Sequence, residues 1–491
     1  MKTFTKAALG LALLPGLSVA GQPSAEQLPA KPVQTDTNFI VVLVDDLGYD
    51  ESGFMGADDM FTPNLDKIAA GGTHFTQGYV TSSVCGPSRA GLISGRYQDR
   101  LGIWGNFSRN AKIGFPTNQP MMQDHFKEAG YTTAAIGKWH FGHFEEEHKP
   151  WNRNLDYFYG FLGGGHDYFN ANMHYNGRNN RSPIYRNGQM VEYPNGTYLT
   201  DEFSREAVEF IERNHDKPFF LHLAYNAVHA PYQAPEHYLK RVDELMDGEF
   251  ATWHRRVIAA MLLAMDDGLG DIMTTLDEKG IADNTAIVFL SDNGYQTIVR
   301  RKEPVNLAGN PADLRGFKGD TFEGGIRVPF VINWPGVVPA GKQYTKPVIS
   351  LDILPTLTRN IPLVENTPEL DGVDLVPYLN GEKEGRPHET MFFRFFHDIA
   401  YRKGDWVLTW NDQHKVAGEK RANRELVKEE VKAMLFNLND DVAQRRDLRH
   451  EQPEKFQELF NEYLDLLEEF PEPEFPALFQ TPYTVEFTED L

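Results

Sequence analysis

Cysteine is almost absent from this chain: Cys85 is the single one among 491 residues. One thiol cannot form a disulfide within the chain, so the fold has to depend on its hydrophobic core and on any metal it binds. The length is sufficient for one large domain and a smaller second one.

Basic residues are also few relative to acidic ones. The chain has 48 Lys and Arg against 70 Asp and Glu, a formal net charge of -22. This balance argues against a nucleic-acid-binding surface and against adhesion to an anionic membrane. If the substrate is an anion, its pocket must be locally basic within an acidic surface.

Long apolar runs are missing after residue 20, so we expect no membrane span. The segment Met1–Ala20 has Lys2 and Lys6 and then the apolar run Ala7–Ala20, which is the layout of a secretory signal peptide. A membrane anchor is the alternative, but the run is short and contains Pro15. The sequence therefore predicts a secreted or periplasmic protein.

The stretch around Cys85 has an unusual composition. The cysteine is followed by Gly-Pro-Ser-Arg, and Pro87 suits the first position of a helix that continues through Ala90–Ile93. Cys85 would then lie at the N-terminal end of the helix dipole, where free backbone N–H groups favour an anion. A buried small residue beside a helix cap is the simpler interpretation. Arg89 in the first turn argues against it.

Carboxylates follow two strands that are predicted to be buried on both faces. The apolar run Asn38–Val44 ends in Asp45-Asp46, and the run Ala286–Ser291 ends in Asp292-Asn293. In open α/β sheets the ligand crevice lies at the carboxyl ends of the strands. Solvated turns are the alternative. Four oxygen ligands indicate Ca²⁺, with Mg²⁺ as the alternative.

Further candidate residues lie in loops near predicted strand ends. Lys138 and His140 follow a strand in 131–136, His229 follows a strand over 218–224, and Lys318 lies in a glycine-rich loop. A structural role is the usual one for a lone histidine. The segment 157–180 is rich in Gly, Asn and aromatic residues, and we expect a surface loop that could contact a sugar, or an ordinary glycine-rich loop. Candidate substrate-binding residues are His166, Arg178 and Arg327.

Residues 85–96 closely resemble the sulfatase signature, Cys-x-Pro-Ser-Arg with Leu92 and Gly95 at fixed offsets; Ser94 stands where the family often has Thr. Residues 130–140 resemble the family's second signature, and the resemblance extends from about Asn38 to Leu448. It implies an α/β fold of the alkaline-phosphatase-like type: a central, mostly parallel sheet flanked by helices, and a smaller C-terminal α+β subdomain with a short antiparallel sheet.

We expect four segments: a signal peptide over 1–20, an exposed leader over 21–37, a catalytic domain over 38–381, and a C-terminal subdomain with an acidic tail over 382–491.

The resemblance also implies roles for individual residues. In that family the cysteine is oxidised to formylglycine by a maturation enzyme, and the hydrated aldehyde is the nucleophile. Carried over by position, the metal ligands are Asp45, Asp46, Asp292 and Asn293, with the modified Cys85 completing the shell. Arg89 steadies the diol, Lys138 and Lys318 hold the sulfate oxygens, His140 contacts the diol, and His229 is a candidate proton donor near the bridging oxygen.

The expected activity is release of sulfate from a sulfated carbohydrate, with an algal polysaccharide of the carrageenan or ulvan type favoured. A glycosaminoglycan is the alternative substrate. A phosphoesterase or phosphonate hydrolase on the same fold is the alternative activity. A non-catalytic sugar-binding relative is disfavoured, because such a module has no need of the complete set of ligands and cations.

Overall fold

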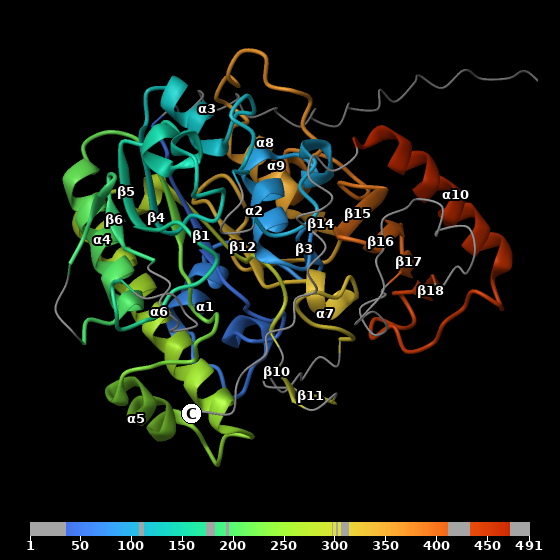
Figure 1. Cartoon of the computed structure of the whole chain (residues 1–491), viewed down its shortest axis with the longest axis horizontal. Coiled ribbons are helices and arrows are strands. Elements are labelled where there is room, and N and C mark those ends of the chain that lie inside the picture. Colours follow the sequence, from blue (N-terminus) through green and yellow to red (C-terminus); the bar gives the residue numbers. More distant parts are fainter. Residues whose placement is uncertain are drawn as a thin grey trace, which may run out of the picture. The chain divides into compact units, whose positions relative to one another are not determined.

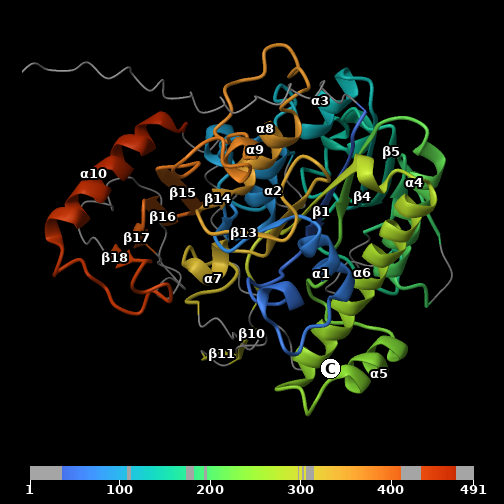
Figure 2. The same cartoon turned by 180° about the vertical axis from the view of Figure 1, so that it is seen from behind.

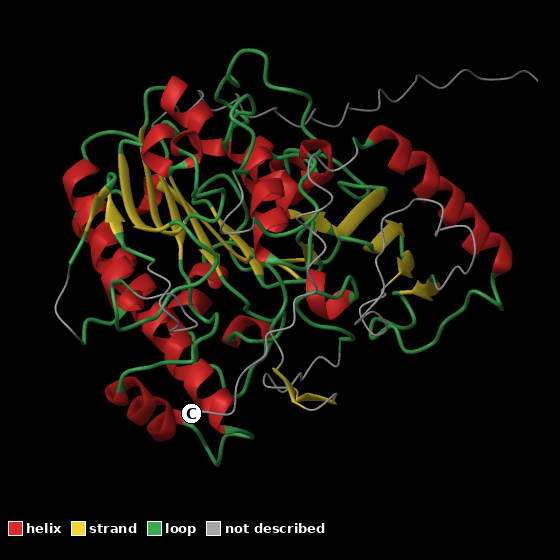
Figure 3. Cartoon of the chain, viewed as in Figure 1, coloured by secondary structure: helices red, strands yellow, loops and turns green. Residues whose placement is uncertain are grey.

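The computed structural model describes residues 36–107, 112–172, 182–192, 196–296, 298–300, 303–305, 314–410 and 433–471. The signal peptide expected over 1–20 and the acidic tail after residue 471 lie outside these residues. Within them, a large sheet has helices packed on both faces (Figures 1 and 3).

The described residues form a ten-stranded sheet whose middle is parallel. Strands β9, β1, β8, β4 and β5 all run in one direction, whereas β12 on one side and β6 on the other run antiparallel to their neighbours. The order across the sheet is β13 (Lys342–Tyr344), β2 (Thr73–Phe75), β12 (Phe330–Asn333), β9 (Thr285–Ser291), β1 (Asn38–Val44), β8 (Phe219–Ala224), β4 (Thr132–Lys138), β5 (Tyr157–Phe161), β6 (Tyr185–Arg186) and β7 (Gln189–Met190).

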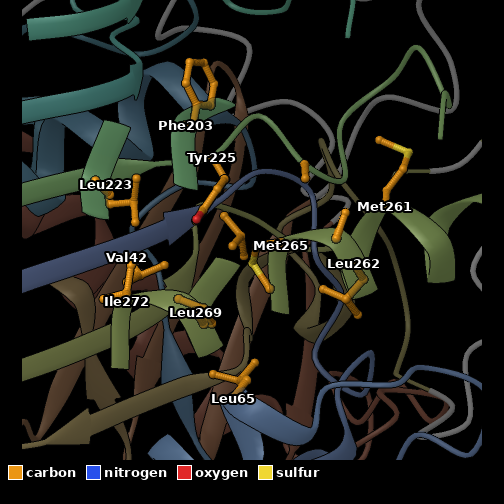
Figure 4. Packing of buried hydrophobic residues seen from close by; sticks show 14 of the residues in the cluster. Val42, Leu65, Phe203, Leu223, Tyr225, Met261, Leu262, Met265, Leu269 and Ile272 are labelled. Carbon is orange, nitrogen blue, oxygen red and sulfur yellow. The ribbon is translucent and has the colours of Figure 1, made fainter. Parts of the chain in front are cut away.

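The two faces of β1 belong to two separate cores, as its unbroken apolar sequence requires. Ile40, Val42 and Val44 pack with α1, α4, α5 and α6, while the alternate residues pack with α2, α3, α8 and α9. Figure 4 shows side chains of α6, among them Met265 and Leu269, together with Val42 from the sheet. The helices are α1 (Pro63–Ala70), α2 (Cys85–Ser94), α3 (Met122–Glu128), α4 (Leu199–Asn214), α5 (Glu236–Leu245), α6 (Trp253–Glu278), α8 (Ile353–Leu357) and α9 (Val376–Leu379).

The C-terminal part of the described chain is a four-stranded antiparallel sheet with one long helix, as expected (Figure 2). Its strands β15 to β18 follow the sequence order and are covered by α10, whose Leu459 and Tyr463 join the core of this part. The elements are β15 (Thr390–Phe395), β16 (Asp398–Lys403), β17 (Trp406–Trp410), β18 (Met434–Asn437) and α10 (Pro453–Glu469). Shorter elements are β3 (Gly78–Tyr79), β14 (Val348–Ile349), β10 (Ile298–Arg300), β11 (Glu303–Val305) and α7 (Glu323–Ile326).

Two local predictions differ from the structure. The segment from 157 begins with the buried strand β5 and only then becomes a loop, because its aromatic residues pack beside β4. The helix after the cysteine begins at Cys85 itself, so Pro87 is its third residue. Proline is tolerated there because the first N–H groups of a helix have no partner within it. In the part of the chain that is described, no helix has the length and apolar character needed to cross a membrane.

Candidate active site

Two neighbouring strands bring four polar side chains together at their carboxyl ends. Because β1 and β9 pair in parallel, Asp45 and Asp46 lie beside Asp292 and Asn293. The Asp46 backbone N–H donates to Asp292 Oδ1 at 3.3 Å, and Asn293 Nδ2 donates to Asp46 Oδ1 at 2.8 Å. All four residues are buried. Carboxylates this close, away from water, need positive charge nearby.

Cys85 lies against this cluster from the first turn of α2. Its Sγ is 3.6 Å from Asp45 Oδ1, and the side chain is buried. Burial raises the pKa of the Cys85 thiol to about 12, although Lys138 and Lys318 partly oppose this effect. The group is therefore a neutral thiol at physiological pH, and it is a poor nucleophile as it stands, since the thiolate is the reactive form.

Three buried cations surround the carboxylates. Lys138, the last residue of β4, places Nζ 2.5 Å from Asp45 Oδ2. Lys318 Nζ is 2.7 Å from Asp46 Oδ1, although 272 residues separate the two in the sequence. Arg89 Nε lies 2.8 Å from Asp292 Oδ2. The basic side chains expected within an acidic chain are therefore present, but each of them faces one of three buried carboxylates.

The charge of the cluster is unevenly compensated. Burial disfavours ionisation of Asp45, but Lys138 and the other cations around it outweigh burial and lower the pKa of this carboxyl. The pKa of Asp46 is lowered too, as Lys318 opposes its burial. Burial and the nearby Asp45 charge instead raise the pKa of Asp292, despite its contact with Arg89. Asp292 is thus the carboxylate with the greatest need of further positive charge.

Two histidines lie at this edge of the sheet. His229 Nε2 is 3.8 Å from Asp46 Oδ2, and its Nδ1 lies 2.6 Å from the Ala230 carbonyl oxygen. This carbonyl can only accept, so Nδ1 carries a proton. Burial lowers the pKa of both His229 and His140. His140 has a left-handed backbone (φ 59°), and its Nδ1 has no hydrogen-bond partner among the described residues.

The donor set fits a divalent cation. Asp45, Asp46, Cys85 and His229 each offer a ligand atom, and these atoms lie within 4.8 Å of one another. Asn293 Oδ1 is buried and makes no hydrogen bond within the described structure. A buried amide oxygen without a donor, beside carboxylates, is the arrangement that Ca²⁺ or Mg²⁺ would satisfy.

Two of the three predicted substrate-binding residues, His166 and Arg327, have their contacts outside this cluster. His166 is buried, with Nε2 2.6 Å from the Ser182 carbonyl oxygen. Arg327 donates to the Thr76 carbonyl oxygen from Nε at 2.8 Å and pairs with Glu323. Arg178 lies outside the described residues. The loop that carries His166 does approach the site, since a Cβ built on Gly164 would lie 3.0 Å from His140 Nε2.

Sequence reasoning missed residues that act on the site from behind. Arg255 of α6 forms a buried ion pair with Glu51 and a second pair with the partly exposed Asp59, and Glu51 accepts the Gly48 N–H at 2.7 Å. This network holds the loop that begins with Asp45. His222 of β8 is buried, and neither of its ring nitrogens has a hydrogen-bond partner in the described part of the chain; burial and then the Arg89 charge lower its pKa. No local sequence signal marks these residues, because their partners are distant in the chain.

The sheet topology, the acidic strand ends and the buried cations that pair with them define a hydrolase site of the alkaline-phosphatase-like type. A family model described as Sulfatase matches residues 37–360. The chain therefore belongs to the sulfatase family and is a sulfuric ester hydrolase, as the sequence motifs predicted.

Individual relatives agree with this assignment. The chain is 32% identical over 428 residues to N-acetylgalactosamine-6-sulfatase of Canis lupus familiaris, covering 82% of this chain and 74% of the relative. It is similar to Ps i-CgsB, whose structure in complex with k-i-k-neocarrahexaose has a TM-score of 0.77, 33% identity, and coverage of 89% and 94%. It is also similar to the PsFucS1 sulfatase from Pseudoalteromonas sp., with a TM-score of 0.72, 25% identity, and coverage of 89% and 91%.

Proposed function

We propose that this enzyme releases sulfate from a sulfated carbohydrate, using a divalent metal and a formylglycine made from Cys85 by a maturation enzyme. The observation that carries the proposal is the buried cluster in which Asp45, Asp46, Cys85 and His229 offer ligand atoms within 4.8 Å of one another. Ca²⁺ is our preferred ion and Mg²⁺ the alternative, because every protein oxygen donor here is hard and the shell is rich in carboxylates.

The residues that would hold the metal are Asp45, Asp46, Asp292 and Asn293, with the modified residue 85 completing the shell. When bound, the cation would draw charge from the sulfate oxygens, and the hydrated aldehyde of residue 85 would supply a hydroxyl nucleophile. Arg89 would orient that hydroxyl group, since it lies four residues after residue 85 and therefore on the same face of α2.

Lys138 and Lys318 would bind sulfate oxygens. Their ammonium groups are buried and lie at the carboxylates, so they are placed to stabilise charge in a pocket that excludes water. His140, with its unbonded Nδ1, would accept a proton from residue 85.

His229 would donate a proton to the leaving oxygen of the sugar. Its pKa is lowered first by burial and then by Lys318, so the ring is neutral in the free enzyme. A bound sulfate would neutralise the lysine charge and raise that pKa, so Nε2 would take up a proton from solvent and could pass it to the leaving oxygen, while Nδ1 keeps its proton on the Ala230 carbonyl. General acid assistance of this kind contributes about 10²–10⁴-fold when the leaving group is poor.

The substrate that we favour is an algal polysaccharide of the carrageenan or ulvan type, or its oligosaccharides. The similarity to Ps i-CgsB, solved with k-i-k-neocarrahexaose, supports carrageenan. The similarity to a mammalian N-acetylgalactosamine-6-sulfatase favours a glycosaminoglycan as the second candidate. Secretion or periplasmic export through residues 1–20, and a boundary between catalytic domain and C-terminal subdomain at 381/382, belong to the same proposal.

The test combines a mass measurement with substrate comparison. Conversion of the Cys85 thiol to an aldehyde lowers the intact mass by about 18 Da, from the covalent change itself. The matured, calcium-loaded enzyme should hydrolyse an aryl sulfate faster than the matching aryl phosphate, and should lose activity in a chelator. The rates of sulfate release from carrageenan, ulvan and glycosaminoglycan oligosaccharides then rank these substrates.

A Cys85→Ala variant is the control, since it keeps the surrounding cluster and cannot be matured. Matured enzyme that cleaves phosphate esters and leaves every sulfate ester intact would refute the proposal.

A further inference from the structure

A basic cavity lies away from the residues described above, at the free edge of the large sheet. It has a volume of about 480 Å³ and is bordered by the edge strand β13 with the residues that follow it, and by Tyr378 of α9 with residues from 381–385 after that helix. Both elements are labelled in Figure 2. The side chains that matter for its chemistry are Lys342, Tyr344, Lys346, Tyr378 and Lys383.

The charge of this cavity is opposite to that of the chain. Its lining contains three lysines and one carboxylate, from Glu384, whereas the chain carries a net charge of -22. Lys342 Nζ lies 2.5 Å from the Leu379 carbonyl oxygen, and Lys346 Nζ lies 2.6 Å from that of Gly385. Lys383 contacts the Tyr378 ring, and within the described residues none of the three lysines pairs with a carboxylate, so their charges are available to an anion.

Aromatic rings complete the lining. Lys383 Nζ is 5.4 Å from the centre of the half-buried Tyr378 ring. Tyr344 is buried, and its hydroxyl group has no hydrogen-bond partner in the described part of the chain. Flat apolar rings beside a few placed polar groups are typical of sites for ligands that are both apolar and polar, as sugar rings are.

The cavity lies at the same end of the strands as the active site, namely their carboxyl ends. Tyr344 of β13 pairs with Phe75 of β2. Through the pairing of β2 with β12 and of β12 with β9, this position is level with Leu290, two residues before Asp292. Strands β13 and β9 are three steps apart in the sheet, a lateral separation of about 15 Å at the usual strand spacing. A polysaccharide of several sugar units can span that distance.

We infer that this cavity is an accessory site for a sulfated polysaccharide chain, distinct from the site of hydrolysis. The inference rests on the proposed function, since it takes the substrate to be a sulfated carbohydrate. Sulfate groups of the chain would contact the lysines, and a sugar face would lie on Tyr378. The site would hold a polyanion close to the active site of an enzyme whose overall charge repels it.

The experiment compares two charge-matched triple variants of the full-length, matured enzyme. One carries Lys342→Ala, Lys346→Ala and Lys383→Ala. The control replaces the exposed Lys67, Lys217 and Lys240 by Ala instead. The probes are carrageenan polymer, the same polymer after chemical desulfation, and a small aryl sulfate; binding is measured by affinity electrophoresis at low salt.

We expect the cavity variant to bind carrageenan about tenfold more weakly, since three exposed charge contacts each contribute modestly. Its KM for the polymer should rise by a similar factor, with kcat and the aryl sulfate kinetics unchanged. The control should match the parent. The Lys383 ammonium group makes no hydrogen bond within the described residues, so Lys383→Glu should weaken polymer binding without disturbing the fold, and it guards against a folding defect in the triple variant.

Three results would overturn the inference: full polymer affinity in the cavity variant, an equal loss in the control, or equal binding of the desulfated polymer. A parent enzyme that cleaves sulfated oligosaccharides yet ignores the polymer overturns this site alone. A parent enzyme that cleaves no sulfate ester overturns the proposed function, so the two failures are separable.

Discussion

Arg255→Ala and Arg256→Ala remove neighbouring arginines from the same helix, and we expect very different results. Arg255 has a side chain that is 1% exposed, and it pairs with Glu51 and, from Nε at 2.6 Å, with Asp59. Removing one partner of a buried pair leaves an uncompensated charge and costs about 3–5 kcal/mol. Arg256 pairs with Asp243 at 2.6 Å where both are partly exposed, and such pairs contribute about 0–1 kcal/mol.

The Arg255 variant should also bind its metal more weakly. Glu51 accepts the Gly48 N–H, and Gly48 lies two residues after Asp46. Loss of the arginine therefore loosens the loop that presents the acidic cluster. The assay is unfolding in urea at pH 8, followed by the shift in melting temperature on adding Ca²⁺. We expect a smaller calcium shift in Arg255→Ala and the parent's shift in Arg256→Ala.

The pH dependence provides an internal check. Burial raises the pKa of Glu51, and the Arg255 charge opposes that effect. Without Arg255 the folded-state pKa rises further above the unfolded value. A group with a raised folded pKa contributes stability that is present at low pH and is lost as pH rises through the folded pKa. The deficit of Arg255→Ala should therefore shrink from pH 8 towards pH 5. Equal small losses in both variants, or a deficit that ignores pH, would refute this reasoning.

Three further predictions concern single residues. Lys318→Ala should lower kcat/KM for an aryl sulfate by about 10²–10³-fold with the fold intact, because a buried charge at the reacting group is lost. Steady-state kinetics measure the loss, and circular dichroism checks the fold. Activity within threefold of the parent would contradict the prediction. Asp266 accepts the Leu65 N–H at 2.8 Å, and burial raises the pKa of Asp266 to about 6. A raised folded-state pKa means that this carboxyl lowers the melting temperature as the pH rises from 4 to 7. Asp266→Asn should abolish that fall, and an unchanged pH profile would count against the prediction. His388 Nε2 lies 2.6 Å from Asp352 Oδ1; burial opposes protonation of His388, but the Asp352 charge outweighs burial and raises the pKa of His388. The pair should therefore stabilise the protein below pH 6.5 and lose this effect as the pH rises. The melting temperatures of His388→Phe and the parent should converge towards high pH.

Much of the fold follows from local pattern. The apolar run Asn38–Val44 is a strand with both faces covered, and the structure confirms this. The predicted strand over 218–224 is β8, which begins one residue later. Composition did not predict the strand β5, because the Gly and aromatic residues of this segment also occur in loops. They form a strand here because β4 provides a hydrogen-bonding partner. Tertiary pairing outweighs such weak local preferences.

The chemistry of the site could be predicted from the sequence, since strand ends, a lone cysteine and glycine-rich loops carry residue types that packing does not require. The geometry of the site could not be predicted in this way. Lys318 reaches Asp46 over 272 residues, and Arg255 reaches Glu51 over 204. Charges on elements far apart in the chain are brought into contact only when the sheet pairs β1 with β9 and α6 packs beneath it. Residue types fix which reactions are available, while burial and long-range pairing set the protonation, spacing and rigidity with which they can occur.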